Sequence, residues 1–269
     1  MIVGMRGVVF LLVLLLQQFQ PAPGAELLHR PLDQILDVNV RDGLVYYRAL
    51  KSDRGRLDRY VASLNVPAAT YQGWSKNQQM AFWVNAYNAF VLQTVINNYP
   101  LKATIKNIPG AFDKNTFHAA GRAVTLDQIE KTILPEFKDP RVFLALGRGA
   151  VGSGRLRSEA YTADRLQKQL ADLESEFVDN RQLYRADRMN NQISITPIFS
   201  WREAEWVEGY AAKADAVYGQ RSPIERAIIA FITPHLLPLE KEFVKKNEFR
   251  VVFHEMDWKL NDLTGGRVE

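Results

Sequence analysis

Apolar residues recur at helical spacing along most of the chain. The pattern predicts helices over residues 33–40, 57–64, 125–135, 162–177, 201–218 and 222–234. Two of these begin with a capping box, Thr125 with Gln128 and Ser222 with Glu225, and Thr162 is the expected cap of a third.

Shorter apolar runs predict strands. They cover residues 43–47, 142–146, 192–195 and 249–253, and residues 117–124 alternate as in a hairpin. Because helices outnumber short, scattered strands, the predicted fold class is α+β: a mainly helical single domain with a small sheet of short strands. Residues 26–269 contain no linker and no repeat, so we expect them to form that one domain.

The longest predicted helix covers residues 75–99. Ser75 and Gln78 fit a capping box at its start, and Pro100 ends it. Its apolar residues lie on nearly every side, which predicts a central helix.

Asn85 and Asn88 are three residues apart in this helix and share one face. A buried amide without partners costs about 1–3 kcal/mol. Both side chains must therefore bond either to the backbone of a neighbouring loop or to a bound ligand.

Residues 1–25 have the pattern of a secretory signal peptide. The apolar run over residues 8–16 is too short to span about 30 Å of hydrocarbon, and small residues up to Ala25 provide a cleavage region. We expect a periplasmic or secreted protein that begins near Glu26 and has no stable membrane anchor after processing. The alternative is an uncleaved anchor, because Pro23 is unfavourable near a cleavage site.

Composition excludes several kinds of chemistry. The 269 residues include no cysteine, which excludes thiol nucleophiles, disulfides and cysteine metal sites. The 34 basic and 30 acidic residues nearly balance at a net charge of +4, so nucleic acid is not an expected partner. The sequence has no HExxH, HxH or Asp-rich calcium motif, and we predict neither a metal nor a cofactor.

A glycine-rich loop over residues 147–155 carries two arginines. Free backbone N–H groups together with Arg148 and Arg155 could hold a phosphate or carboxylate. The alternative is an ordinary connection in which glycines adopt positive φ and both arginines face solvent.

Ser153 lies in the same loop and is a weak candidate nucleophile. Its neighbours do not form GxSxG, and a serine nucleophile needs a histidine base within hydrogen-bond reach. The candidate bases are His29, His118, His235 and His254.

Asp257 precedes Trp258 and is a further candidate binding residue. Its carboxylate could accept hydrogen bonds from an arginine or from backbone N–H groups beside the apolar tryptophan. The alternative is a structural turn, because Asn261 and Asp262 follow closely.

Several blocks together resemble the DUF547 domain, a family of unknown function. They are residues 78–89 (QQMAFWVNAYNA), 99–100, 126–130, 139–142, 156–157, 199–201 and 257–261. The family occurs in bacterial proteins, which are often exported, and in plant proteins, where it follows a leucine zipper that this sequence lacks. Family members usually carry two His and two Cys at positions that here hold Lys131, Phe143, Arg148 and Ser153.

Two functional hypotheses follow. The first is a non-catalytic binding protein of the cell envelope, with a polar cleft between the Asn85/Asn88 face and the loop over 147–155. Its ligand would be an unidentified small molecule or protein, and the two arginines favour an anionic one. The second is a hydrolase or transferase in which Ser153 replaces the family's cysteine.

Overall fold

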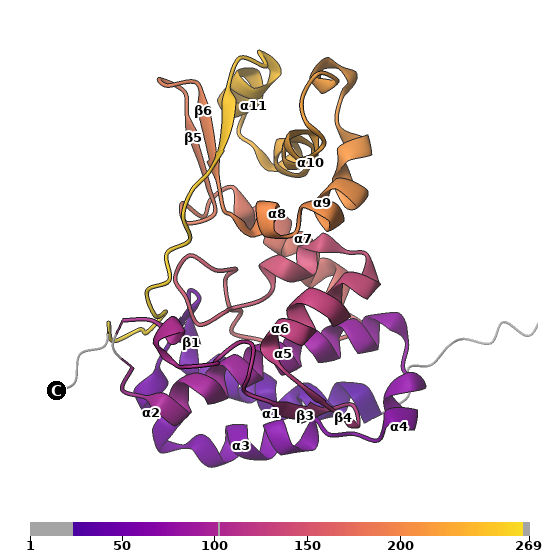
Figure 1. Ribbon diagram of the computed structural model, residues 1–269, viewed down its shortest axis with the longest axis vertical. Helices are drawn as coiled ribbons and strands as arrows, with labels where there is room; N and C mark the ends of the chain where they lie inside the picture. Colours follow the sequence, from indigo (N-terminus) through magenta and orange to yellow (C-terminus); the bar gives the residue numbers. More distant parts are fainter. Residues whose placement is uncertain (1–23, 102, 266–269) are drawn as a thin grey trace, which may run out of the picture.

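The computed structural model describes residues 24–101 and 103–265, so the predicted signal peptide lies almost entirely outside the described residues. The molecule is elongated (Figure 1). The N-terminal helices form one end, and the C-terminal helices and the largest sheet form the other (Figure 1).

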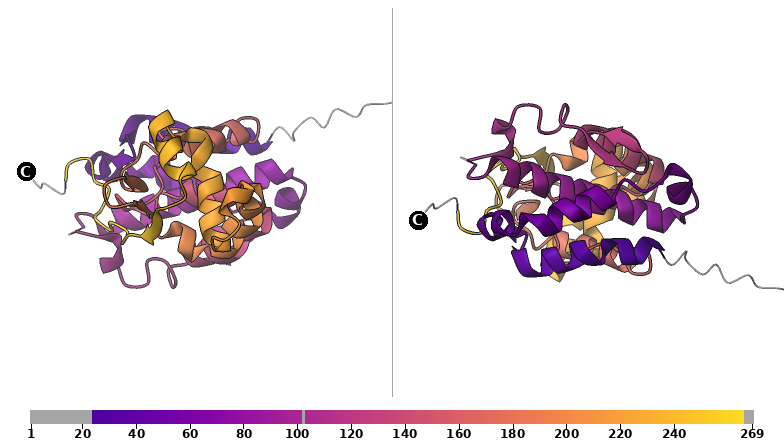
Figure 2. Two further views of the ribbon diagram at one scale, coloured as in Figure 1. Left: turned by 90° about the horizontal axis from the view of Figure 1, so that it is seen from above. Right: turned by 90° about the horizontal axis from the view of Figure 1, so that it is seen from below.

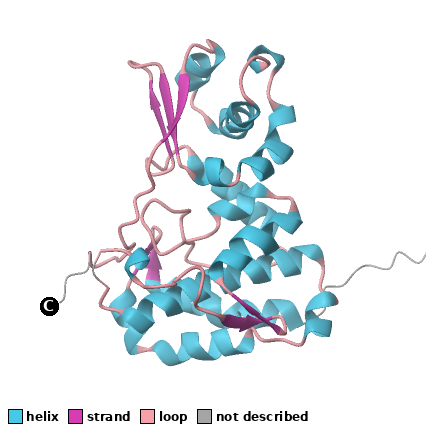
Figure 3. Ribbon diagram, in the orientation of Figure 1, coloured by secondary structure: helices cyan, strands magenta, loops and turns pink. Residues whose placement is uncertain are grey.

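Helices make up most of the described residues (Figure 3). They are α1 (Gly24–Asn39), α2 (Tyr47–Ser52), α3 (Arg54–Ser63), α4 (Ala68–Gln72), α5 (Lys76–Asn98), α6 (Leu126–Gln128), α7 (Leu166–Phe177), α8 (Ile198–Trp201), α9 (Glu203–Tyr210), α10 (Pro223–Ile232) and α11 (Pro238–Lys245). None of these helices is both long and apolar enough to cross a membrane.

The strands form three small sheets. They are β1 (Val40–Arg41), β2 (Leu44–Val45), β3 (Phe117–Ala119), β4 (Arg122–Val124), β5 (Tyr184–Asp187), β6 (Gln192–Ile195) and β7 (Arg250–Phe253). The pairs β1–β2 and β3–β4 are antiparallel hairpins, whereas in the third sheet β6 pairs antiparallel with β5 and parallel with β7. The predicted mainly helical α+β fold with short strands is confirmed.

Helix α5 is central, as predicted. Ser75 Oγ accepts from the N–H of Gln78, and Gln78 Oε1 accepts from the N–H of Ser75, which completes the capping box. The helix packs against α1, α2 and α3. These helices lie at the lower end of the molecule in Figure 1 and face the viewer in the right view of Figure 2. Most of its side chains are buried in a hydrophobic core that extends from α1 to the C-terminal segment.

The C-terminal segment runs back from β7 to the other end of the molecule. There Asp262 forms a parallel bridge with Val45, and Leu260 forms an antiparallel bridge with Ala150. Asn261 accepts from the Tyr47 hydroxyl at 2.7 Å and donates to the Gly43 carbonyl at 2.8 Å. This return segment, residues 254–262, therefore joins the two ends of the molecule.

The prediction of a strand over residues 142–146 was wrong. A 3₁₀ helix, Pro140–Leu144, occupies this position, with the Asp139 side chain accepting from the N–H of Arg141. The run is buried on all sides, so its apolar pattern carries no period that separates strand from helix.

Two helix predictions also need correction. Thr162 does not cap α7, which begins at Leu166; its hydroxyl instead accepts from Arg165 Nε. The helix predicted over 201–218 is divided at Arg202 and continues after Tyr210 as separate 3₁₀ turns.

Candidate functional site

Asn85 and Asn88 hold the backbone of two loops. Asn85 donates to the Tyr161 carbonyl at 2.8 Å and accepts from its N–H at 2.9 Å. Asn88 donates to the Ala145 carbonyl at 3.0 Å and accepts from the Gly147 N–H at 2.8 Å. Both amides are buried, so this is the backbone clamp predicted as one of the two alternatives.

Most glycines of the loop over residues 147–155 are required because a side chain would clash with neighbouring atoms, and not because the backbone adopts a positive φ. A Cβ built on Gly154 would lie 1.8 Å from the Leu144 carbonyl oxygen, and one on Gly152 would lie 2.5 Å from the backbone nitrogen of Asp257. Gly149 is the glycine of this loop with a positive φ, +66°. One side of the loop therefore packs closely against neighbouring backbone, and its other side lines a cavity.

Arg148 neither faces solvent nor shares a cavity with Arg155, contrary to both predicted alternatives. It is 1% exposed, and its Nη2 lies 2.6 Å from Glu130 Oε1. Its Nη1 also donates to the carbonyl of Phe143 at 3.1 Å. The physical reason is that a buried guanidinium needs a buried counter-charge, and Glu130 supplies it across the core.

The Glu130 carboxylate stays ionised in this setting. Burial alone would raise the pKa of Glu130, but the charge of Arg148 and hydrogen bonds from Arg148 and Tyr87 outweigh that effect and hold the pKa below its usual value. Arg148 is thus a structural partner of Glu130.

Ser153 is buried, and its hydroxyl donates to the Leu146 carbonyl at 2.6 Å. A backbone carbonyl oxygen accepts a hydrogen bond but is too weak a base to remove the serine proton, so this contact does not activate Ser153 as a nucleophile. His29 Nδ1 lies 2.8 Å from the Tyr60 hydroxyl instead, and His254 bonds to other groups as well. The base that the Ser153 hypothesis requires is not among these contacts.

The structure also brings together a serine and a histidine that are far apart in the sequence. Ser194 Oγ on β6 lies 3.1 Å from His254 Nδ1, and His254 Nε2 lies 2.9 Å from the Gln182 carbonyl oxygen. The carbonyl can only accept, so Nε2 carries the proton and Nδ1 accepts from Ser194. Neither side chain lines the cleft described next.

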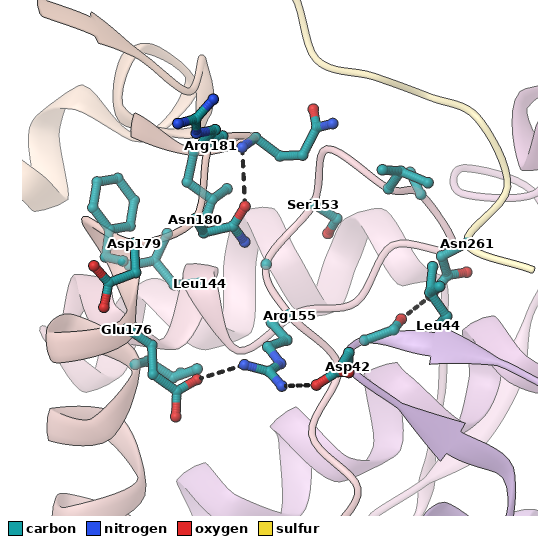
Figure 4. Close-up of a pocket in the computed structure, with 18 residues that line it drawn as sticks. Asp42, Leu44, Leu144, Ser153, Arg155, Glu176, Asp179, Asn180, Arg181 and Asn261 are labelled. Carbon is teal, nitrogen blue, oxygen red and sulfur yellow. Dashed lines mark hydrogen bonds and ion pairs between the residues drawn. The ribbon is translucent and has the colours of Figure 1, made fainter. Parts of the chain in front are cut away.

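A cleft of about 620 Å³ lies on the outer side of the glycine-rich loop. Ser153 and Asn261 lie on one side of it, Asn180 and Arg181 on the other, and Arg155 between them (Figure 4). Of the residues predicted for a polar cleft, Ser153 and Arg155 line this one, whereas Asn85, Asn88 and Arg148 do not.

Arg155 separates this cleft from a second cavity. Its Nη2 lies 2.5 Å from Asp42 Oδ1, and its Nη1 lies 3.5 Å from Glu176 Oε2 (Figure 4). The second cavity, about 380 Å³, shares Asp42, Arg155 and Glu176 with the first and adds Arg157 and Glu159. The Arg155 side chain, held by two carboxylates, thus stands between the two cavities.

Asp257 lies outside both cavities. Its Oδ1 accepts from the Lys259 N–H at 2.9 Å, and its carbonyl accepts from the Gly152 N–H at 2.8 Å. This is the structural turn named as the alternative reading.

Residues 176–183 form a wall of the 620 Å³ cleft that was not predicted from the sequence. Asp179, Asn180 and Arg181 follow the end of α7, and the Asn180 side chain accepts from the N–H of Gln182 in a local turn. The Asp-Asn-Arg run signals a turn, but a sequence pattern does not show that this turn faces the glycine-rich loop.

No group of three or more metal-binding side chains occurs within the part of the chain that the structure describes. No curated protein matches the chain, and no solved structure matches it. The family model for DUF547, a protein family of unknown function, matches residues 71–178. The resembling blocks over 199–201 and 257–261 lie beyond that match. The matched segment, residues 71–178, contains the asparagine clamps, the Arg148–Glu130 pair and one wall of the cleft, so these features lie in the part of the chain that is similar to DUF547.

Proposed function

We propose that this protein is an exported, non-catalytic binding protein of the cell envelope, and that its ligand is a small polar molecule held in the cleft beside Arg155. The observation that carries the proposal is the cleft itself: about 620 Å³, a size usual for small-molecule sites. Polar side chains from four separate segments converge on it, including Asp42, Ser153, Asn180 and Asn261.

The charges in the cleft favour a ligand with groups of both signs. Three carboxylates, Asp42, Glu176 and Asp179, line it together with two arginines, Arg155 and Arg181. The Arg155–Asp42 pair is exposed, with side-chain exposures of 42% and 88%, so a ligand carboxylate could replace Asp42 at little cost. A ligand amine could then approach the carboxylates. Amino acids and short peptides have this charge pattern.

Thermal unfolding with matched probes tests the site. Zwitterionic dipeptides should raise the melting temperature in a concentration-dependent way, and more than inorganic phosphate or spermidine, which each carry one sign of charge. Arg155→Ala should abolish the shift. Arg54→Ala is the control, since Arg54 is another ion-paired arginine of similar side-chain exposure, 44%. If no probe binds, or if the Arg155→Ala protein binds as tightly as the wild type, the proposal fails.

The export part of the proposal has its own test. Expression in a bacterium should give a processed chain whose N-terminus, measured by mass spectrometry, lies close to Glu26. Recovery of the intact N-terminal segment in a membrane fraction would contradict it.

A further inference from the structure

Exposed apolar side chains gather at the upper end of the molecule, away from the cleft. Met189, Leu237 and Leu239 are 96%, 68% and 69% exposed. They are the three most exposed large apolar side chains in residues 24–101 and 103–265. Single exposed apolar residues are ordinary, but three at one tip indicate a surface that contacts something.

Two neighbouring elements present these side chains. Met189 lies in the turn between β5 and β6, whereas Leu237 and Leu239 lie at the start of α11. Arg188 of the turn lines the same cavity, about 420 Å³, as Leu237 and Leu239. The turn and α11 both lie at the upper end of the long axis, where the segment between α9 and α10 also ends (Figure 1), so a broad flat partner can contact them at this end of the molecule.

Basic residues outnumber acidic ones around this tip. Residues 184–191 and 237–246 contain five basic and three acidic residues. Two of the acids are already engaged, because Asp187 accepts from Asn190 and Glu240 accepts from the N–H of Leu237. The positive charges are those of Arg185, Arg188, Lys241, Lys245 and Lys246.

We propose that this tip docks the protein on an anionic lipid surface. Met189, Leu237 and Leu239 enter the boundary between headgroups and acyl chains, and the surrounding arginines and lysines pair with lipid phosphates. Protruding apolar side chains beside basic ones are the combination that binds such surfaces. Protein interfaces are enriched in aromatic residues and depleted of lysine, whereas the exposed side chains of this tip are aliphatic and three lysines lie near them.

The absence of cysteine from the sequence allows a clean test. Met189→Cys, labelled with an environment-sensitive fluorophore, is titrated with vesicles of phosphatidylcholine and phosphatidylglycerol and with vesicles of phosphatidylcholine alone. The label should shift to the blue with the anionic vesicles, and added salt should weaken the response. The matched control is Val38→Cys, because Val38 is 65% exposed and lies on α1 at the opposite end.

The label reports the surroundings of residue 189 itself, so the result does not depend on how the N-terminal segment behaves. Adding Leu237→Asp and Leu239→Asp should weaken the vesicle response by about tenfold or more, whereas Val38→Asp should leave it unchanged. These positions are exposed, so circular dichroism should show native folding for each variant. The proposal is overturned if position 189 does not respond to anionic vesicles, if position 38 responds equally, or if the two aspartates change nothing.

Discussion

A buried polar side chain stabilises this fold when each of its atoms has a partner, and Asn85 and Asn88 meet that condition through loop backbone. Asn85→Ala would leave the N–H and carbonyl of Tyr161 unpaired. We expect Asn85→Ala or Asn88→Ala to lower the free energy of unfolding by about 1–3 kcal/mol each, measured by urea denaturation. Asn97→Ala, at an exposed position of the same helix, should change it little. Wild-type stability in the Asn85→Ala protein would show that the clamp is unimportant.

The Arg148–Glu130 pair predicts a larger effect. Arg148→Met should destabilise the protein by about 3–5 kcal/mol, because it leaves a buried carboxylate without its counter-charge. Adding Glu130→Leu should recover part of that loss, since the unpaired charge is then removed. Denaturant titration of the two single variants and the double variant gives the coupling energy. Additive effects of the two substitutions would contradict a direct pair.

We expect His29 to make stability depend on pH. Burial lowers the pKa of His29 from 6.5 to about 3, so between these values the unfolded chain takes up a proton that the folded protein does not. Stability should therefore fall as pH falls below 6.5, by about 1.4 kcal/mol per pH unit from this group. Urea unfolding near neutral pH and about two units lower should show a smaller loss for His29→Gln than for the wild type. Equal losses would mean that His29 does not cause the dependence.

At the scale of elements, helix starts whose hydrogen bonds involve only residues close in sequence were predictable. Ser75–Gln78, Thr125–Gln128 and Ser222–Glu225 all form the expected capping boxes, because each cap is decided by residues three apart. The run over 142–146 was not, because burial on all sides removes the periodicity that distinguishes strand from helix. The cost of burying an unpaired amide predicted that the asparagines need partners but did not choose between loop backbone and a ligand, because the loop partners lie 57 to 76 residues away.

Glycines in different elements should respond in opposite directions to alanine. Gly154→Ala places a methyl group 1.8 Å from the Leu144 carbonyl oxygen, so the loop must move and we expect a loss of about 3 kcal/mol or more. Gly55→Ala in α3 has as its nearest neighbour only an arginine side chain at 3.5 Å and should stabilise by about 0.5–1 kcal/mol. Thermal unfolding of the two variants compares them directly. A tolerated Gly154→Ala would show that the loop is not held against the core.

At the scale of the whole molecule, the cleft was the least predictable feature. Asp42, Ser153, Asn180 and Asn261 come from four regions of the chain, and nothing in their local sequence shows that they meet. Arg155 could be named because the glycine-rich loop around it is conspicuous. Its two carboxylate partners could not, since Asp42 is 113 residues away and Glu176 lies on a different element, so both ion pairs depend on tertiary packing.

The return segment also sets the order in which the molecule can be completed during synthesis. The N–H of Val45 and the hydroxyl of Tyr47, made early, have their partners in Asn261, and β6 gains its parallel neighbour only from β7. These contacts therefore cannot form until the C-terminal segment has emerged from the ribosome. Up to that point each end of the molecule lacks one of its neighbours and remains accessible to a chaperone.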